Sequence, residues 1–367
     1  MTGRESRPAE TDEAASAEAN SPSNVGTVLG TVLGPRRKRR DVDHDSDAPA
    51  GRRTLADVVV AYGVVIFLAI MLIGFSVWLP DSFPNWSNFK SIINDQAIPG
   101  ILALAVVIPL AAGEFDLSVG ATLGFASVIS AYASTHGVGV GPVILLCVAI
   151  GCVVGIVNAF LVVGLGVNAF IATLGTATVL SGGNLLVTNG AVIFGIQGSL
   201  VSVAQRSLAG VPSRVYFLAI LAVFLWYALD HTPYGRFLRA TGLGREAARL
   251  TGVPTSRYLA SSFVVAGAIA GFAGVLQTSL VSSATPTVGP DFLLPAYAAA
   301  FLGATTIKRG MFNVWGTIVG VFVLAVGITG LQEAGAPFWV SNIFNGAALI
   351  VAVSTAAIVD RRRRRLV

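Results

Sequence analysis

Long apolar runs, separated by polar connections, dominate the chain from residue 58 onward. A helix needs about 20 apolar residues to cross the hydrocarbon core of a bilayer. The runs at 215–230 and 292–306 are shorter than that, so we expect those helices to be tilted, broken or extended. The pattern predicts an all-α, polytopic membrane protein with about ten transmembrane helices. The ten runs lie at 58–79, 92–112, 117–135, 141–163, 168–187, 215–230, 258–280, 292–306, 313–331 and 339–359.

Polar segments flank this apolar body at both ends. Residues 1–53 are rich in Ala, Glu, Ser, Pro and Asp and contain no aromatic residue. That composition cannot bury a core, and it predicts a disordered tail. Its basic block, 36–40, either holds the first span's start in the cytoplasm or docks to lipid or a partner. We place the transmembrane domain at 54–360, with an inner loop at 231–257. A basic tail follows it at 361–367.

The distribution of charge predicts which side each loop occupies. With the N-terminus inside and ten spans, 21 of the 24 Lys and Arg residues fall on the inner side. Only Lys90, Arg206 and Arg214 fall outside. Such a bias is typical of cytoplasmic loops, so both termini are expected in the cytoplasm. An odd number of spans would place one terminal basic cluster outside.

Composition supports a membrane protein and gives little support to an enzyme. Charged residues make up 12% of the chain and hydrophobic residues 54%. No lysine follows a Walker-type glycine loop, so we expect no ATP site in this chain. The three histidines are scattered, which predicts no metal site, and no catalytic triad is readable. Cys147 and Cys152 lie in one apolar run and are interpreted as packing residues. The net charge of +5 reflects basic clusters beside spans, not nucleic-acid binding.

One polar, basic segment interrupts the apolar body, at 235–254. It predicts a short helix, 245–250, that Gly252 and Pro254 terminate, because Gly just past a helix end and Pro soon after are stop signals. An isolated helix of under two turns is not stable in water, so something outside it must hold it.

Two carboxylates stand at the junction of the second and third runs, in GEFDLSVGATLG (113–124). Acidic residues near membrane depth are candidates for function. Asp116 has an alternative role, because its side chain is placed to cap the third span's N-terminus. Glu114 either lines a path or is a solvated residue of the junction.

Two further segments offer polar groups. NAFIATLGTATVLSGG (168–183) carries Thr173, Thr176 and Thr178, which either line a path for a hydroxylated substrate or bond back to their own helix. The segment 282–310 contains three prolines and Gly289, and it predicts an irregular outer connection. Irregular backbone at membrane depth lines a cavity or is buried in protein. Asp291 in this segment is placed to cap a helix.

At these residues the chain resembles the ribose-type permeases of bacterial ABC importers. The stretches that carry the resemblance are GEFDLSVG, NAFIATLG, HTPYGRFLRATGLGREAARLTGV, Ser-Ala-x-Pro-x-x-Gly at 283–289 and the C-terminal FNGAALIVAV. They follow the family's order over residues 58–359. The chain departs from the pattern at Asn168, Ser181, Ala304, the Arg245-Glu246 pair and 307–309.

The resemblance implies a type II ABC importer-like permease in the bacterial plasma membrane. It implies a second permease copy, two ATPase subunits that bind ATP and Mg, and an extracytoplasmic sugar-binding protein. Residues expected to couple to the ATPase are Arg245, Glu246, Ala247, Ala248, Arg249, Leu250 and Gly252. Residues expected to form the translocation path or a structural signature are Glu114, Asp116, Ser118, Phe170, Thr173, Gly175, Pro286 and Gly289.

We therefore expect a permease subunit that moves a monosaccharide by alternating access, powered by a separate ATPase. One alternative is a permease of the same kind for an amino acid or a nucleoside. Another is a secondary transporter or channel, which would more often place acids or histidines within spans. A structural scaffold is the last alternative, and it would not need the polar inner loop.

Overall fold

The computed structural model describes residues 55–364, with side chains placed for 62–355. The predicted tail at 1–53 lies outside the described residues, as do the side chains of the predicted basic tail at 361–367. Each of the ten apolar runs coincides with a helix, as predicted. These helices are α1 (Leu55–Trp78), α3 (Ala97–Ala111), α4 (Ser118–Thr135), α5 (Val140–Ala159), α6 (Ala169–Thr188), α8 (Ser213–His231), α11 (Thr255–Val281), α12 (Pro290–Ala304), α13 (Val314–Glu333) and α14 (Val340–Arg364).

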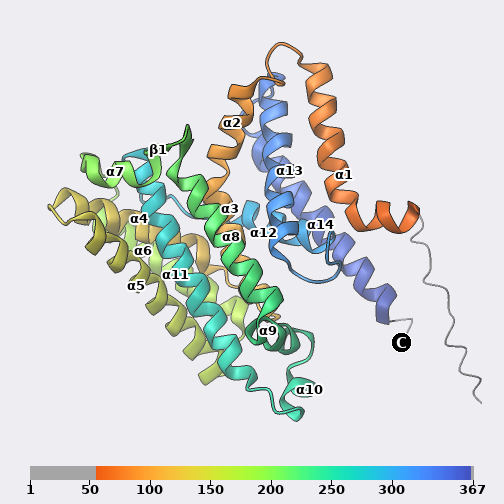
Figure 1. Ribbon diagram of the computed structural model, residues 1–367. Coiled ribbons are helices and arrows are strands. Elements are labelled where there is room, and N and C mark those ends of the chain that lie inside the picture. Colours follow the sequence, from red (N-terminus) through yellow and green to blue (C-terminus); the bar gives the residue numbers. More distant parts are fainter. Residues whose placement is uncertain (1–54, 365–367) are drawn as a thin grey trace, which may run out of the picture. The chain divides into compact units, whose positions relative to one another are not determined.

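Shorter elements fill the connections. The segment 188–214 holds one short helix, α7. The expected helix at 245–250 is α10, and the same loop holds a second helix, α9. Figure 1 places α9 and α10 at one end of the long helices, with α2, α7 and β1 at the other. The short elements are α2 (Trp86–Asp95), the π-helical turn η1 (Phe160–Gly164), α7 (Gly198–Gln205), the antiparallel strands β1 (Ser207–Leu208) and β2 (Val211–Pro212), α9 (Pro233–Leu243) and α10 (Arg245–Leu250).

Five helical stretches in the described part of the chain are long and apolar enough to cross a membrane. They are α5 with η1, α6, α8, α11 and α13. A sixth is added if α2 and α3, which meet at a bend of 42°, count as one broken span. The apolar parts of α1 and α14 are shorter, at Tyr62–Trp78 and Val340–Thr355. The helices are therefore those predicted, whereas a total of ten spans stays a prediction.

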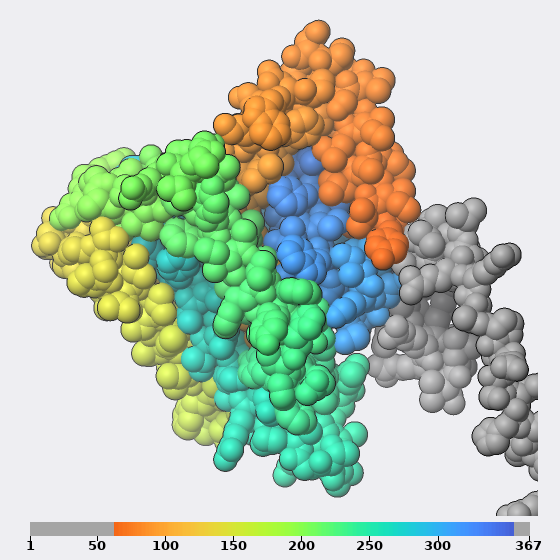
Figure 2. Space-filling model, viewed as in Figure 1, coloured from red at the N-terminus to blue at the C-terminus, as the bar shows by residue number. Residues whose placement is uncertain are grey.

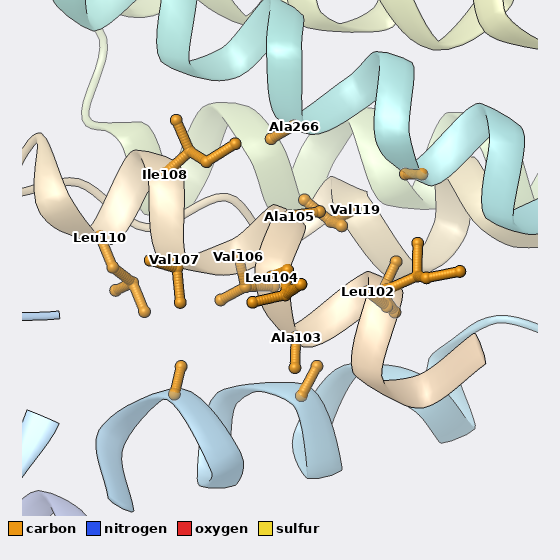
Figure 3. Packing of buried hydrophobic residues seen from close by; sticks show 14 of the residues in the cluster. Leu102, Ala103, Leu104, Ala105, Val106, Val107, Ile108, Leu110, Val119 and Ala266 are labelled. Atoms are coloured by element: carbon orange, nitrogen blue, oxygen red, sulfur yellow. The ribbon is translucent and has the colours of Figure 1, made fainter. Parts of the chain in front are cut away.

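Helix α3 is the centre of the packed helices. Almost all of its residues are buried, including Leu102, Ala103 and Leu104, which have no exposed surface. It contacts α4, α8, α11, α12 and α13. In the close view, α3 lies between α11, which contributes Ala266, and α12 on the opposite side (Figure 3). An apolar helix that is buried all round fixes the positions of both of its ends, where polar turns begin.

Glycines let the backbones of α5 and α11 touch. A Cβ at Gly151 would collide with the backbone of Gly267, and a Cβ at Gly271 would collide with the backbone of Cys147. Small residues at four-residue spacing on α11 thus permit this close approach of the two helices. Cys147 is buried in the same contact, and both cysteines are free, as expected of packing residues.

The connection before α12 runs back among the helices. Ala284 exchanges two backbone hydrogen bonds with Ile193. Further along, the carbonyl of Val288 lies against Gly124 of α4, and Gly289 lies against Gly120. Helix α12 therefore begins beside the first turns of α4, not at the end of α11. That position explains why the predicted eighth span is short.

Candidate functional site

The turn between α3 and α4, residues 112–117, brings together most of the predicted polar groups. The Asp116 carboxylate accepts hydrogen bonds from the Ser118 amide at 3.0 Å and the Ser118 hydroxyl at 2.6 Å. The first of these satisfies a free N–H group at the start of α4. The capping role of Asp116 is therefore confirmed, although the side chain acts from one residue before the formal cap, Leu117.

A buried chain of hydrogen bonds runs from this cap into two more helices. The side-chain amide nitrogen of Asn158 on α5 donates to the Ser118 hydroxyl at 2.8 Å. The Thr176 hydroxyl on α6 donates to the side-chain oxygen of Asn158 at 2.7 Å. Asn158 has no exposed surface. Asn158 is not among the residues predicted from the sequence. The sequence does show a lone side-chain amide within an apolar run. Burying such an amide costs free energy unless it is hydrogen-bonded.

The two motifs predicted separately meet at Thr173. Its hydroxyl accepts the Leu117 amide at 3.0 Å and donates to the carbonyl of Ala169 at 2.8 Å. Thr176 and Thr178 also bond to carbonyls of their own helix. All three threonines thus bond back to their own helix. Thr173 and Thr176 in addition join α6 to the turn and to α5, which the sequence did not predict.

The same turn contacts α12 through aromatic side chains. The Asp116 amide donates to the Tyr297 hydroxyl at 2.9 Å, and the Phe115 ring stacks on Tyr297 and Phe301 at 5.8 and 6.2 Å. Only 1% of Asp116 is exposed. Burial raises the pKa of its carboxyl to about 6, against the opposing effect of the Ser118 hydrogen bonds.

Glu114 faces the opposite way, toward the inner loop. Its carboxylate accepts a hydrogen bond from Arg245 of α10 at 2.7 Å, and the side chains are 27% and 42% exposed. Neither of the two roles predicted for Glu114, a path lining or a solvated junction residue, includes this ion pair. The reason is distance along the chain, since the partners are 131 residues apart.

Helix α9 packs directly on the same turn. A Cβ on Gly242 would collide with the backbone of Ala111 and of Gly113. Gly113 itself has φ +85, which favours glycine. No side chain therefore separates the backbone of α9 from the end of α3.

A second charged cluster ties α9 to the connection after α12. Asp230, at the end of α8, accepts from Arg239 at 2.6 Å and from Lys308 at 2.7 Å. The Asp230 side chain is 7% exposed and that of Arg239 15%. The polar loop is thus attached at two places, to the turn before α4 and to the turn before α13.

Helix α10 presents most of its residues to the surface (Figure 2). The side chains of Glu246 and Arg249 are 83% and 66% exposed, and they lie 4.0 Å apart. Leu250 is 88% exposed, whereas Ala248 is buried. We expected that something outside α10 must hold this helix. Contacts within the chain do so, through the buried Ala248 and the ion pair of Arg245 with Glu114.

The predicted end of α10 is confirmed. The Gly252 amide donates to the carbonyl of Arg249 at 2.9 Å, with φ +85 at the glycine. The next amide, of Val253, reaches the carbonyl of Ala248 at 3.0 Å. This left-handed glycine ends the helix and satisfies its last carbonyls.

The predicted path residues divide into three groups. Glu114, Asp116, Ser118 and Thr173 meet at the turn before α4. Phe170 and Gly175 are exposed on α6. Pro286 and Gly289 belong to the segment that packs against Gly120 and Gly124. In the described residues, no group of three or more His, Cys, Asp or Glu side chains could hold a metal ion.

Comparison with known proteins gives consistent matches over nearly all of the apolar body. The family model described as "Branched-chain amino acid transport system / permease component" matches residues 88–353. The galactose/methyl galactoside import permease protein MglC of Haemophilus influenzae is 31% identical over 79% of this chain and 92% of its own length. The ribose import permease protein RbsC of Escherichia coli is 28% identical over 86% and 98%.

A third relative has a different named solute. The autoinducer 2 import system permease protein LsrD of Salmonella paratyphi B is 29% identical over 69% of this chain and 78% of its own length. No solved structure matches the chain at a comparable level of significance.

Proposed function

This chain belongs to the family of branched-chain amino acid transport system permease components, and we propose that it is the membrane-spanning subunit of a bacterial ABC importer for a monosaccharide. As a member of that family it is a multi-pass protein of the cell membrane. It is a transport subunit, not an enzyme.

Its relatives support a sugar as the solute. Two of them are named for galactose or methyl galactoside and for ribose, and both align over more than nine-tenths of their own length. The family description instead names branched-chain amino acids, which keeps an amino acid as the second candidate. Autoinducer 2, the solute named for the third relative, defines a further probe for the uptake assay.

The energy for transport would come from a separate ATPase. The observation that carries this proposal is the Glu114–Arg245 ion pair, which joins the exposed helix α10 to the buried turn before α4. An ATPase docked on Glu246, Arg249 and Leu250 would move α10 when it binds ATP. The ion pair and the Gly242 contact would then carry that movement to the ends of α3 and α4.

The same architecture supports two further proposed partners. With α9 and α10 on the cytoplasmic side, α2, α7 and the two strands face outward, toward an extracytoplasmic binding protein. One chain carries one α10, so two copies of the permease would match two ATPase subunits. The mechanism proposed is alternating access, in which the ends of α3 and α4 move together with the coupling loop.

Reconstitution tests the proposal. The chain would be placed in liposomes with its ATPase and binding protein, and uptake of labelled ribose, galactose, autoinducer 2 and leucine measured. We expect ATP-dependent uptake of a sugar that persists when the proton and sodium gradients are collapsed. Uptake of leucine alone would favour the amino acid candidate, and loss of uptake with the ion gradients would favour a secondary transporter.

A further inference from the structure

A cavity of about 190 Å³ lies where two irregular segments meet. One is the break between α2 and α3, at Gln96, where the helix axis bends by 42°. The other is the start of α12, just after Gly289 with φ +124. Helices α13 and α14 form the remaining walls. None of the groups assigned above to coupling or to the path lines this cavity.

The cavity lies within the apolar layer. Helices α3 and α12 have 15 residues each, so each is about 22 Å long, against a hydrocarbon core of about 30 Å. Both end at polar turns with charged residues, Glu114 after α3 and Lys308 after α12. Their first residues therefore begin below the opposite edge of the membrane. Broken backbone at such depth requires a cavity or burial in protein.

Asn345 of α14 indicates that this cavity receives a polar ligand. The residue is 8% exposed, and its amide oxygen is buried with no hydrogen-bond partner among the described residues. Leaving a buried acceptor unsatisfied costs roughly 1–3 kcal/mol. Asn345 lines the cavity, so this unsatisfied acceptor belongs to a residue of the cavity wall.

Two more polar side chains border the same space. Gln96 stands at the N-terminal cap of α3 but makes no side-chain capping bond. Asp291 stands in the first turn of α12, and the expectation that it caps that helix is not met, because no capping bond from a side chain is present there. Between residues 62 and 355, neither side chain has a hydrogen-bond partner.

The other walls are apolar. Pro99 and Phe292 lie in the first turns of α3 and α12, and Pro295 lies within α12. Helix α13 contributes Leu324 and Ala325. A ligand must therefore offer hydroxyl groups on one side and carbon–hydrogen surface on the other, as a sugar ring does. No Lys or Arg lines the cavity, so the carboxylate of an amino acid would find no counter-charge there.

We propose that this cavity is a binding site for the transported solute inside the permease, and that the solute is a neutral, polyhydroxylated molecule of monosaccharide size. The inference rests on the proposed function. Asn345, Gln96 and Asp291 would supply hydrogen bonds, and Phe292 would contact the apolar face of the ring. The volume far exceeds the roughly 30 Å³ that one water molecule occupies in the liquid.

Uptake by the reconstituted complex provides the first test, with labelled ribose and galactose as probes. We expect Asn345→Leu and Gln96→Leu to lower uptake at saturating sugar about fivefold or more, the effect of one lost hydrogen bond. Asn342→Leu, at an exposed position on the same helix, should leave uptake unchanged. If the native chain takes up sugar and all three variants do so at the same rate, the proposed site is wrong but the proposed function stands.

Thiol protection provides a second test that does not depend on turnover. Asn345→Cys would be made together with Cys147→Ala and Cys152→Ala, and labelled with a small water-soluble methanethiosulfonate. We expect labelling that ribose or galactose slows. A thiol that is never labelled, or that is labelled at the same rate with either sugar, would overturn the site. If the native chain imports neither sugar, the proposed function fails and the site fails with it.

Discussion

Arg245 on α10 donates a hydrogen bond over 2.7 Å to Glu114, in the turn that joins α3 to α4. The pair connects the exposed inner loop with the buried centre of the helices. Both side chains are partly exposed, so the pair contributes little to stability, about 0–1 kcal/mol. Its importance lies in the connection, because α10 otherwise contacts few other helices, α9 and α11 among them.

The first prediction concerns this pair. Glu114→Gln and Arg245→Gln should lower sugar uptake per ATP hydrolysed severalfold while leaving the melting temperature nearly unchanged. The exchange Glu114→Arg with Arg245→Glu should restore part of the coupling, because the opposite charges face each other again. Uptake and ATP hydrolysis would be measured on the same proteoliposomes. Arg236→Gln, at an exposed position of the same inner loop that is not assigned to coupling, is the control.

The second prediction concerns the exposed face of α10. Glu246→Ala and Arg249→Ala should separate ATP hydrolysis from uptake, because these side chains are 83% and 66% exposed and free to meet a partner. Membrane insertion and thermal stability should stay unchanged. Binding of the ATPase would be followed by co-purification from detergent. Normal uptake in both variants would refute the role of this face in coupling.

The third prediction concerns the buried carboxyl of Asp116. Its pKa of about 6 exceeds the ordinary value, so the folded state binds a proton more tightly than the unfolded state. Stability should therefore fall as the pH rises from about 4 to about 6, by up to roughly 3 kcal/mol, and then level off. Asp116→Asn keeps an acceptor for Ser118 and should abolish this dependence, whereas Asp116→Ala should destabilise the protein. Melting temperatures at pH 5 and pH 7 would measure both effects.

The fourth prediction concerns Asp230. Asp230→Ala should destabilise the protein by roughly 3 kcal/mol, because Arg239 would be left largely buried without its partner. Lys308→Gln should cost less than about 1 kcal/mol, since that side chain is 42% exposed. Chemical denaturation of the two variants in detergent would give the comparison. Equal losses of stability in the two variants would show that Asp230 and Arg239 behave like an exposed ion pair.

The fifth prediction concerns the contact between α9 and the turn before α4. Gly242→Ala should reduce uptake and lower the melting temperature, because its Cβ would collide with the backbone of Ala111. Gly182→Ala adds the same atom on α6 where nothing lies within 4 Å, and it should have no effect or stabilise slightly. A Gly242→Ala variant that transports and melts like the native chain would show that the backbones can separate without loss.

Much of the fold was readable from the chain in order. All ten apolar runs form helices, because the tendency of a segment to leave water depends on its own composition. The end of α10 at Gly252 was also predicted correctly, since it follows from a local property of glycine. The Asp116 cap was readable for the same reason, as a polar side chain immediately before a helix.

Relationships between distant segments were not readable. Asn158 looked like one amide in an apolar run, and only the structure places it between Ser118 and Thr176. Phe170 and Thr173 were predicted together, but one is exposed and the other buried, because a helix turns successive residues to different faces.

The sequence alone therefore determined the class of protein, the positions of its helices and the polar loop that distinguishes it. Tertiary structure alone decided what that loop contacts. Glu114 and Arg245 are each ordinary charged residues in their own segments, and the pair exists only because α3 and α9 are packed backbone to backbone. Hydrophobicity acts locally along the chain, whereas an ion pair between residues 131 apart depends on how every helix between them is placed.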